Sequence, residues 1–209
     1  MAEFVIRPAG WVVLAILGIS LFTTPGCATS SSVSARGRGE PAAVLSGQVV
    51  RVVDGDTLVV QLASGPLRVR LYAVDAPEKS QPHGREAATA LTRLVAGRQI
   101  SIEPFQQDRY NRMLGIVHVG DTNVNSRLVS QGHAWAYRRY MRKADAKLCS
   151  LEDQARRAER GLWAQANGGK VVAPWDWRSK NKTRKGTAVH NYRGETTEKC
   201  IAAIGQRRQ

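Results

Sequence analysis

Two short acidic clusters lie at the two ends of a segment that alternates like a pair of β-strands. The clusters are Asp54-Gly55-Asp56-Thr57 and Asp75-Ala76-Pro77-Glu78. Between them, residues 58–62 and 67–72 have strand-like patterns and are joined by a turn that contains Gly and Pro. This arrangement predicts a β-hairpin. Because a hairpin brings its outer ends together, we expect Asp56 and Asp75 to lie close to each other.

The residue types at these ends fit metal-assisted attack on a phosphodiester. Two carboxylates and a nearby backbone carbonyl suit a hard cation such as calcium, which takes about 6–8 oxygen ligands. Glu78 could stay outside the metal shell as a base, and Arg70 offers a planar fork to a phosphate. Each cluster alone has an ordinary structural interpretation, since the first is typical of a turn and the second of a helix start.

Taken together, the motifs resemble those of the thermonuclease (staphylococcal nuclease) family. The resemblance runs in order over roughly residues 45–178. The segments that carry it are VDGDT (53–57), RLYAVDAPE (70–78), DRYNRML (108–114), LVSQG (128–132), RGLW (160–163) and PWDW (174–177). It implies a calcium-dependent nuclease that cleaves DNA and RNA with little sequence preference and leaves 3′-phosphate ends.

The resemblance also implies a calcium site, position by position. It assigns the calcium ligands to Asp56, Asp75 and the backbone carbonyl of Ala76. It places Asp54 and Thr57 in or near the outer shell.

The same comparison of motifs implies the catalytic side chains. Glu78 would act as the general base or position the attacking water, and Arg70 and Arg112 would bind the phosphate. Asn111 stands where the family usually has Gly, but Asn tolerates the left-handed conformation better than most residues, so the turn should survive. From the residues alone, Arg112 could equally be a surface charge in a hairpin loop.

A nucleic-acid surface is indicated by aromatic residues among cations, a combination that stacks bases and attracts phosphates. Tyr137 and Tyr140 interleave here with Arg138 and Arg139. The resemblance matches Tyr140 to one of two nucleotide-contacting tyrosines of the family, whereas Arg138 occupies the place of the other. Tyr137 could substitute for it or could pack in the core.

The predicted elements make a small α+β domain over residues 45–178. Five short strands are predicted, with a helix at 84–96 inserted after the third, and two more helices follow at about 123–131 and 144–160. The strand count and turns allow a small barrel, and the resemblance implies a five-stranded OB-fold barrel with three helices. The expected strands are 47–53, 58–62, 67–72, 99–104 and 113–119.

Residues 1–28 have the form of an export signal, because an apolar run too short for a comfortable membrane span follows a basic residue. Cys27 could be the lipidated first residue of a membrane-attached lipoprotein, or cleavage could follow Ala28 instead. A retained N-terminal anchor is the third alternative. Residues 29–44 predict a flexible tether. We therefore expect the protein to be exported to the periplasm or the exterior. We also expect it to be a monomer.

The chain is strongly basic, with 31 Lys and Arg against 17 Asp and Glu, a formal charge of +14. Such a surface favours polyanions, either nucleic acid or anionic lipid and wall polymers. The basic extension at 179–209 should lie outside the barrel, so truncation after Trp177 should leave the catalytic site intact.

Three cysteines are present. If Cys27 is lipidated or removed, Cys149 and Cys200 remain, and such a pair in an exported protein is usually bonded.

Two alternatives to an enzyme stay open: an OB-fold module that binds nucleic acid without cutting it, and a surface lipoprotein whose tail binds polyanions. The presence of every acid and arginine that the family chemistry needs favours the enzyme.

Overall fold

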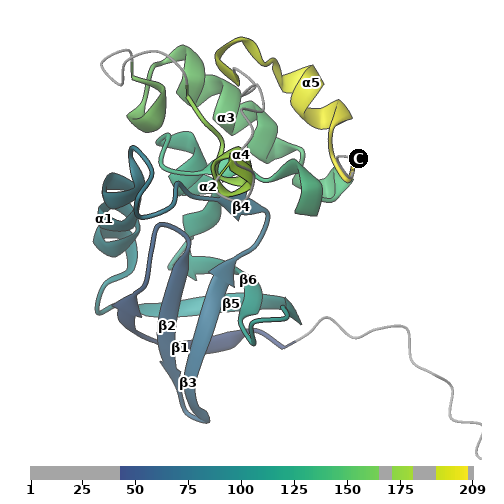
Figure 1. Ribbon diagram of the computed structural model, residues 1–209. Helices are drawn as coiled ribbons and strands as arrows, with labels where there is room; N and C mark the ends of the chain where they lie inside the picture. The colour runs from purple at the N-terminus through teal and green to yellow at the C-terminus, as the bar shows by residue number, and fades with distance from the viewer. Residues whose placement is uncertain (1–42, 165–170, 181–191, 207–209) are drawn as a thin grey trace, which may run out of the picture. The chain divides into compact units, whose positions relative to one another are not determined.

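The strands on both sides of the acidic clusters pair into a closed barrel. The computed structural model describes residues 43–164, 171–180 and 192–206, all of which belong to one compact unit, Gly39–Gln209 (Figure 1). The barrel strands are β1 (Leu45–Val52), β2 (Thr57–Leu62), β3 (Gly65–Leu71), β5 (Gln99–Gln107) and β6 (Met113–Val119).

The barrel closes through one parallel contact. Neighbouring strands pair antiparallel in the order β3-β2-β1-β5-β6, and the parallel pairing of β3 with β6 joins the two ends. A short strand, β7 (Thr122–Asn123), continues beyond β6. The expected five-stranded OB-fold barrel is therefore confirmed.

The predicted hairpin is formed by β2 and β3. Leu62 pairs with Gly65, so the connecting turn is shorter than the sequence indicated. At the other end Thr57 pairs with Arg70, and the Leu71 backbone N–H donates to the Asp56 carbonyl at 2.8 Å. The two ends of the hairpin thus meet, as its pattern predicts.

Helices cover the barrel and extend beyond it. The three expected helices are α1 (Gly84–Val95), α2 (Val124–Ser130) and α3 (Lys147–Arg157), each slightly shorter than predicted. Two more follow that the sequence pattern did not indicate, α4 (Pro174–Lys180) and α5 (Thr197–Ala202). In the part of the chain that the structure describes, no helix is long and apolar enough to span a membrane.

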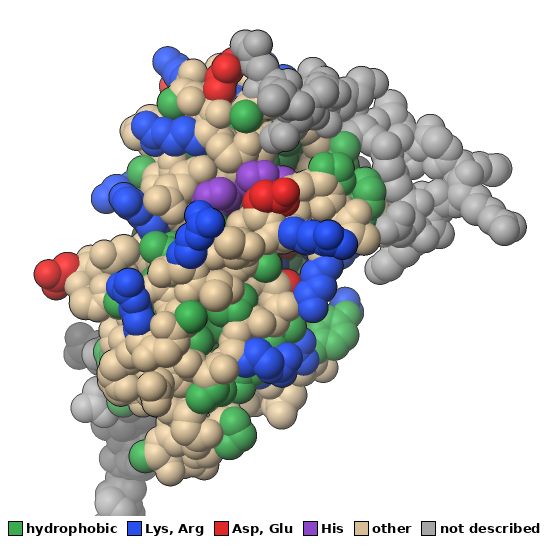
Figure 2. Space-filling view, turned by 90° about the vertical axis from the view of Figure 1, so that its left-hand side faces the viewer, with side chains coloured by type: hydrophobic (Ala, Val, Ile, Leu, Met, Phe, Trp, Pro, Cys, Tyr) green, Lys and Arg blue, Asp and Glu red, His purple; other side chains and the backbone are tan. Residues whose placement is uncertain are grey.

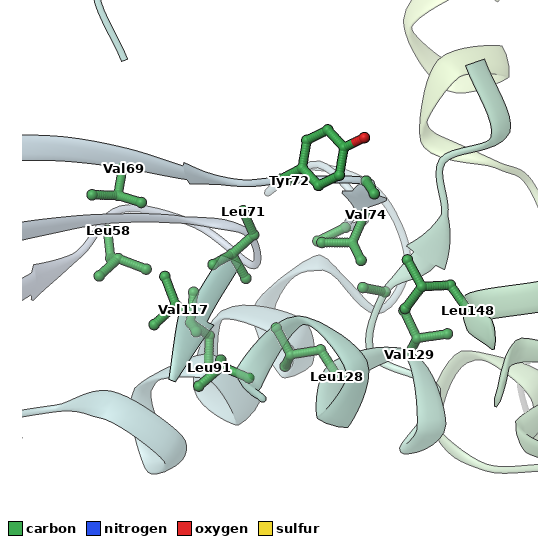
Figure 3. Packing of buried hydrophobic residues seen from close by; sticks show 14 of the residues in the cluster. Leu58, Val69, Leu71, Tyr72, Val74, Leu91, Val117, Leu128, Val129 and Leu148 are labelled. Atoms are coloured by element: carbon green, nitrogen blue, oxygen red, sulfur yellow. The ribbon is translucent and has the colours of Figure 1, made fainter. Parts of the chain in front are cut away.

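The core lies between the barrel and the helices. Figure 3 shows Leu58, Val69 and Leu71 of the hairpin on one side, with Leu91 of α1 and Leu128 of α2 facing them. All five side chains are buried. The apolar surface that they remove from water stabilises the packing of the barrel on its helices by about 25 cal/mol for each Å² buried.

A second core packs the C-terminal elements around tryptophans. The ring of Trp135 meets those of Trp163, Trp175 and Tyr192 edge to face. Trp135 belongs to β8 (Trp135–Ala136), which pairs with β4 (Val74–Asp75) beside the acidic clusters. This core therefore links the C-terminal segment to the strand that carries Asp75.

A disulfide fixes α5 to α3. It joins Cys149 and Cys200, which are 51 residues apart and both buried. This is the pair to which cysteine parity pointed. Cys27 and the predicted export signal lie outside the described residues.

Candidate active site

Two aspartates converge on one arginine at the end of the hairpin. The Arg70 guanidinium forms ion pairs with Asp56 and with Asp75, the latter at 2.7 Å between Nη2 and Oδ1. All three side chains are buried or nearly so. The sequence prediction that the hairpin brings Asp56 and Asp75 together therefore agrees with the structure.

Local backbone geometry sets this convergence. Arg70 alternates with the inward-facing Val69 and Leu71, so it projects from the outer surface of the barrel. The chain then turns at Ala73, whose φ of 60° is left-handed, and enters β4, in which Asp75 is the second residue. The Ala76 backbone N–H donates to Asp56 Oδ2 at 2.7 Å, which fastens the second acidic cluster to the first.

Asp54 and Thr57 complete the first cluster. The Thr57 hydroxyl donates to Asp56 Oδ1 at 3.1 Å, and Asp54 Oδ1 accepts from the Asp56 N–H at 3.1 Å. Burial, and then the charge of Asp56, raise the pKa of Asp54 to about 6. The crowding of carboxylates at this point is what a bound cation would relieve.

Glu78 lies in the loop that leads to α1. Its backbone N–H donates to Gln81 Oε1 at 3.2 Å, and its carboxylate is 41% exposed. Gly84 approaches this loop so closely that a Cβ there would lie 1.9 Å from the Glu78 carbonyl oxygen. The Glu78 backbone is therefore closely restrained, while its carboxylate reaches solvent.

Arg178 of α4 enters the same site, which the sequence analysis missed. Its guanidinium lies 2.7 Å from Asp75 Oδ2 and 2.7 Å from Glu78 Oε1. The expectation that truncation after Trp177 leaves the site intact is therefore wrong, because such a truncation removes Arg178. The tryptophan-rich PWDW segment (174–177), directly before Arg178, is the sequence signal that this region packs against the rest of the domain.

Arg112 lies beside the site without joining its carboxylates. It directly precedes β6, whose first residue, Met113, pairs with Val69, the neighbour of Arg70 in β3. Its Nε and Nη2 bind Asp108 Oδ2 at 2.7 and 2.6 Å. Asn111 takes the left-handed conformation that its position requires, with φ of 58°.

The proposed base-stacking residues fall into two groups. Tyr140 is 51% exposed and Arg139, also exposed, places its guanidinium 5.7 Å from the Tyr140 ring centroid. Tyr137 is half-buried; its ring meets that of Tyr140 edge to face at 4.9 Å and stacks on Trp175 at 5.2 Å. The surface available for stacking is therefore centred on Tyr140.

Arg138 requires a correction. Its side chain is buried and forms ion pairs with Glu152, at 2.7 Å, and with Glu195. A guanidinium that is committed to two acids in the interior is not offered to a phosphate, so the expected nucleic-acid contact by Arg138 is not supported. Its role is to connect α3 to the segment before α5.

The donor chemistry of the acidic clusters fits calcium, although the described residues contain no group of three or more His, Cys, Asp and Glu arranged to hold a metal ion. The expected site needs only two carboxylates and the Ala76 carbonyl, all hard oxygen ligands. Asp54, Asp56, Asp75 and Glu78 supply four carboxylates against two guanidiniums, those of Arg70 and Arg178. The excess of two negative charges equals the charge of one divalent cation.

Basic side chains are spread over one face of the molecule, with fewer acidic ones among them (Figure 2). This distribution agrees with the net charge of +14 and favours a polyanionic partner.

Comparison with known proteins gives one family and several relatives. The family described as "Staphylococcal nuclease homologue" matches residues 68–165. An "Uncharacterized endonuclease" of Escherichia coli O157:H7 is 44% identical over 135 residues, which cover 64% of this chain and 85% of that protein. "Protein ParB" of Escherichia coli is 41% identical over 152 residues, covering 68% and 84%. A "Micrococcal nuclease" of Shigella flexneri is 40% identical over 148 residues, covering 66% and 83%.

Proposed function

Since this chain belongs to the staphylococcal nuclease family, we propose that it is a calcium-dependent nuclease that hydrolyses DNA and RNA with little sequence preference. The observation that carries the proposal is the convergence of Asp56 and Asp75 on Arg70, with Glu78 at the rim of the same site. Two relatives named as nucleases align over most of their own length.

Calcium would be held by Asp56, Asp75 and the Ala76 carbonyl, where it would neutralise charge on the phosphate and lower the pKa of water. Arg70 is fixed by its aspartates and would present its remaining edge to a phosphate oxygen. Arg112 would approach the same phosphate after exchanging its contact with Asp108 for the substrate. Two guanidiniums suit the charge that develops on a five-coordinate phosphorus.

Glu78 would accept a proton from the attacking water. The new bond forms between the water oxygen and phosphorus, and the bond from phosphorus to O5′ breaks. The products are a 3′-phosphate and a 5′-hydroxyl, whose proton comes from solvent. The exposed position of the Glu78 carboxylate supports this role, because a base must reach a solvent-derived nucleophile.

Substrate binding would rely on charge and stacking. Tyr140 and Arg139 form an exposed pair near Tyr137, which adjoins the carboxylates through Arg178. Such contacts read the backbone and the faces of bases and not their edges, which supports low sequence preference.

We also propose that the protein is exported. The signal-like residues 1–28 support this, and a Cys149–Cys200 disulfide suits an oxidising compartment.

The catalytic assignment is tested with two substitutions, one of which should lower turnover and the other calcium affinity. Glu78→Gln removes the proton acceptor, so turnover at saturating calcium and DNA should fall on the order of 10²–10⁴-fold with unchanged calcium affinity. Asp56→Asn removes a ligand charge, so calcium binding measured by titration calorimetry should weaken. Glu86→Gln, at an exposed acid of α1, is the matched control and should change neither. A Glu78→Gln protein that cuts at the parental rate across the pH range would show that the base is another group.

A further inference from the structure

Arg178 joins two carboxylates to which the proposed reaction gives different tasks. Its Nη2 lies 2.7 Å from Asp75 Oδ2, and its Nη1 lies 3.3 Å from Asp75 Oδ1 and 2.7 Å from Glu78 Oε1. One planar guanidinium therefore holds the Glu78 carboxylate at a fixed place relative to Asp75. This bridging geometry is specific to arginine, since a lysine ammonium has no fork.

Glu78 has little else to hold its side chain. Among the residues that the structure describes, Arg178 is the hydrogen-bonding partner of the Glu78 carboxylate, which is 41% exposed. A glutamate side chain without such a partner samples several rotamers, and fixing one of them costs conformational entropy. A charge-assisted bond offsets that cost and selects one orientation.

Arg178 is itself held firmly because its helix is anchored. In α4, the Trp175 ring stacks on Tyr137, and its Nε1 donates to the Tyr192 hydroxyl at 2.9 Å. The segment before α4 is tied to the Glu78 loop as well: buried Gln81 donates to the Val172 carbonyl at 2.7 Å and accepts from the Glu78 N–H. Side chain and backbone of Glu78 are thus both connected to this C-terminal segment.

The net negative charge of the site allows Arg178 to keep its ion pairs when a divalent cation binds. With Arg70 and Arg178 both present, the four carboxylates keep two excess negative charges. Arg178 also keeps its side chain 36% exposed, whereas that of Arg70 is 11% exposed. It therefore lies at the rim, on the Glu78 side of the aspartates.

We propose that Arg178 is a positioning residue of the nuclease site, which holds the Glu78 carboxylate in the orientation that proton transfer requires. The inference rests on the proposed function. Arg178 acts through Glu78 and has no need to touch the substrate. The helix α4 is accordingly part of the catalytic unit and not of a detachable extension.

The test is a double-mutant cycle on the full mature chain. The variants are Arg178→Met, Glu78→Gln and the double substitution, with Arg98→Gln at an exposed arginine as the control for lost charge. Cleavage of DNA is measured at saturating calcium, and calcium affinity is measured by calorimetry. Arg178→Met should lower kcat by about 10–100-fold, the usual effect of removing a group that orients another, with little change in KM. Arg178→Lys should recover part of this loss.

The decisive value is the effect of Arg178→Met in the Glu78→Gln background. If Arg178 acts through Glu78, the second substitution should change kcat by less than about threefold there. Calcium affinity should be unchanged or tighter, because a competing cation has been removed, and thermal unfolding shows whether each variant is folded. Equal losses in both backgrounds, or a folded Arg178→Met protein with parental kcat, would overturn the positioning role alone. A parent that fails to cut with calcium would overturn the proposed function and this inference together.

Discussion

The Cys149–Cys200 disulfide should contribute strongly to stability. It closes a loop between residues 51 apart, and both cysteines are buried. The loop-entropy relation for that length gives about 4 kcal/mol at 25 °C. This is a large part of the roughly 5–15 kcal/mol by which a native domain is stable. In a domain of this size, such a loss corresponds to a fall in Tm of about 8–16 °C.

The measurement compares three proteins by equilibrium urea unfolding. They are the oxidised parent, the parent reduced with dithiothreitol, and Cys149→Ala/Cys200→Ala. The reduced parent controls for the volume lost in the alanine variant, so agreement between these two isolates the crosslink. A difference below about 1 kcal/mol between oxidised and reduced parent would refute the loop-entropy reasoning. Alkylation of both thiols in folded oxidised protein would refute the crosslink itself.

Two further predictions concern the loop and the histidines beside α1. Gly84→Ala should lower kcat by about tenfold or more, because the added Cβ must displace the Glu78 backbone. Gly194→Ala, where a Cβ meets nothing within 4 Å, is the control for both cleavage rate and unfolding. Burial, and then the charge of His83, lower the pKa of His133 from its ordinary 6.5 to about 4. The unfolded chain therefore binds the proton first, and the free energy of unfolding should fall as pH drops from about 6.5 to 4. His133→Asn should make that pH dependence shallower in urea unfolding, and an unchanged slope would contradict the assignment.

Much of the fold could be predicted because its signals are local. The alternation in 58–62 and 67–72 with a Gly-containing turn fixes the β2–β3 hairpin, and the hairpin alone brings Asp56 to Asp75. The apolar spacing of α1, α2 and α3 likewise matches the faces that they bury. These features depend on contacts between residues that are close in sequence.

The role of Arg178 could not be predicted, because its partners are distant in the chain. It lies 103 residues from Asp75 and 100 from Glu78, and contacts such as the stacking of Trp175 on Tyr137 hold its helix beside them. Basic composition made the segment look like a solvated extension. Amino-acid composition gives the charge of a segment but does not show which part of the domain the segment packs against.

The orientation of Arg138 was mistaken for a related reason. The two arginines between two tyrosines at 137–140 indicate a nucleic-acid surface, but the segment forms a short 3₁₀ turn, Arg138–Tyr140, in which neighbouring side chains diverge. Arg138 turns inward to Glu152 and Glu195, while Arg139 and Tyr140 stay exposed. The two acids lie 14 and 57 residues away, so no local pattern identifies them as partners.

The central claim is that the acids and arginines at the end of the hairpin cut phosphodiesters with calcium. The most direct measurement is incubation of the purified protein with plasmid DNA and with RNA, in calcium and in excess chelator. We expect both substrates to be degraded in calcium, to products with 3′-phosphate ends, and to stay intact in chelator. Equal cleavage in chelator would contradict the calcium site at Asp56 and Asp75, and intact substrates under both conditions would contradict the nuclease itself.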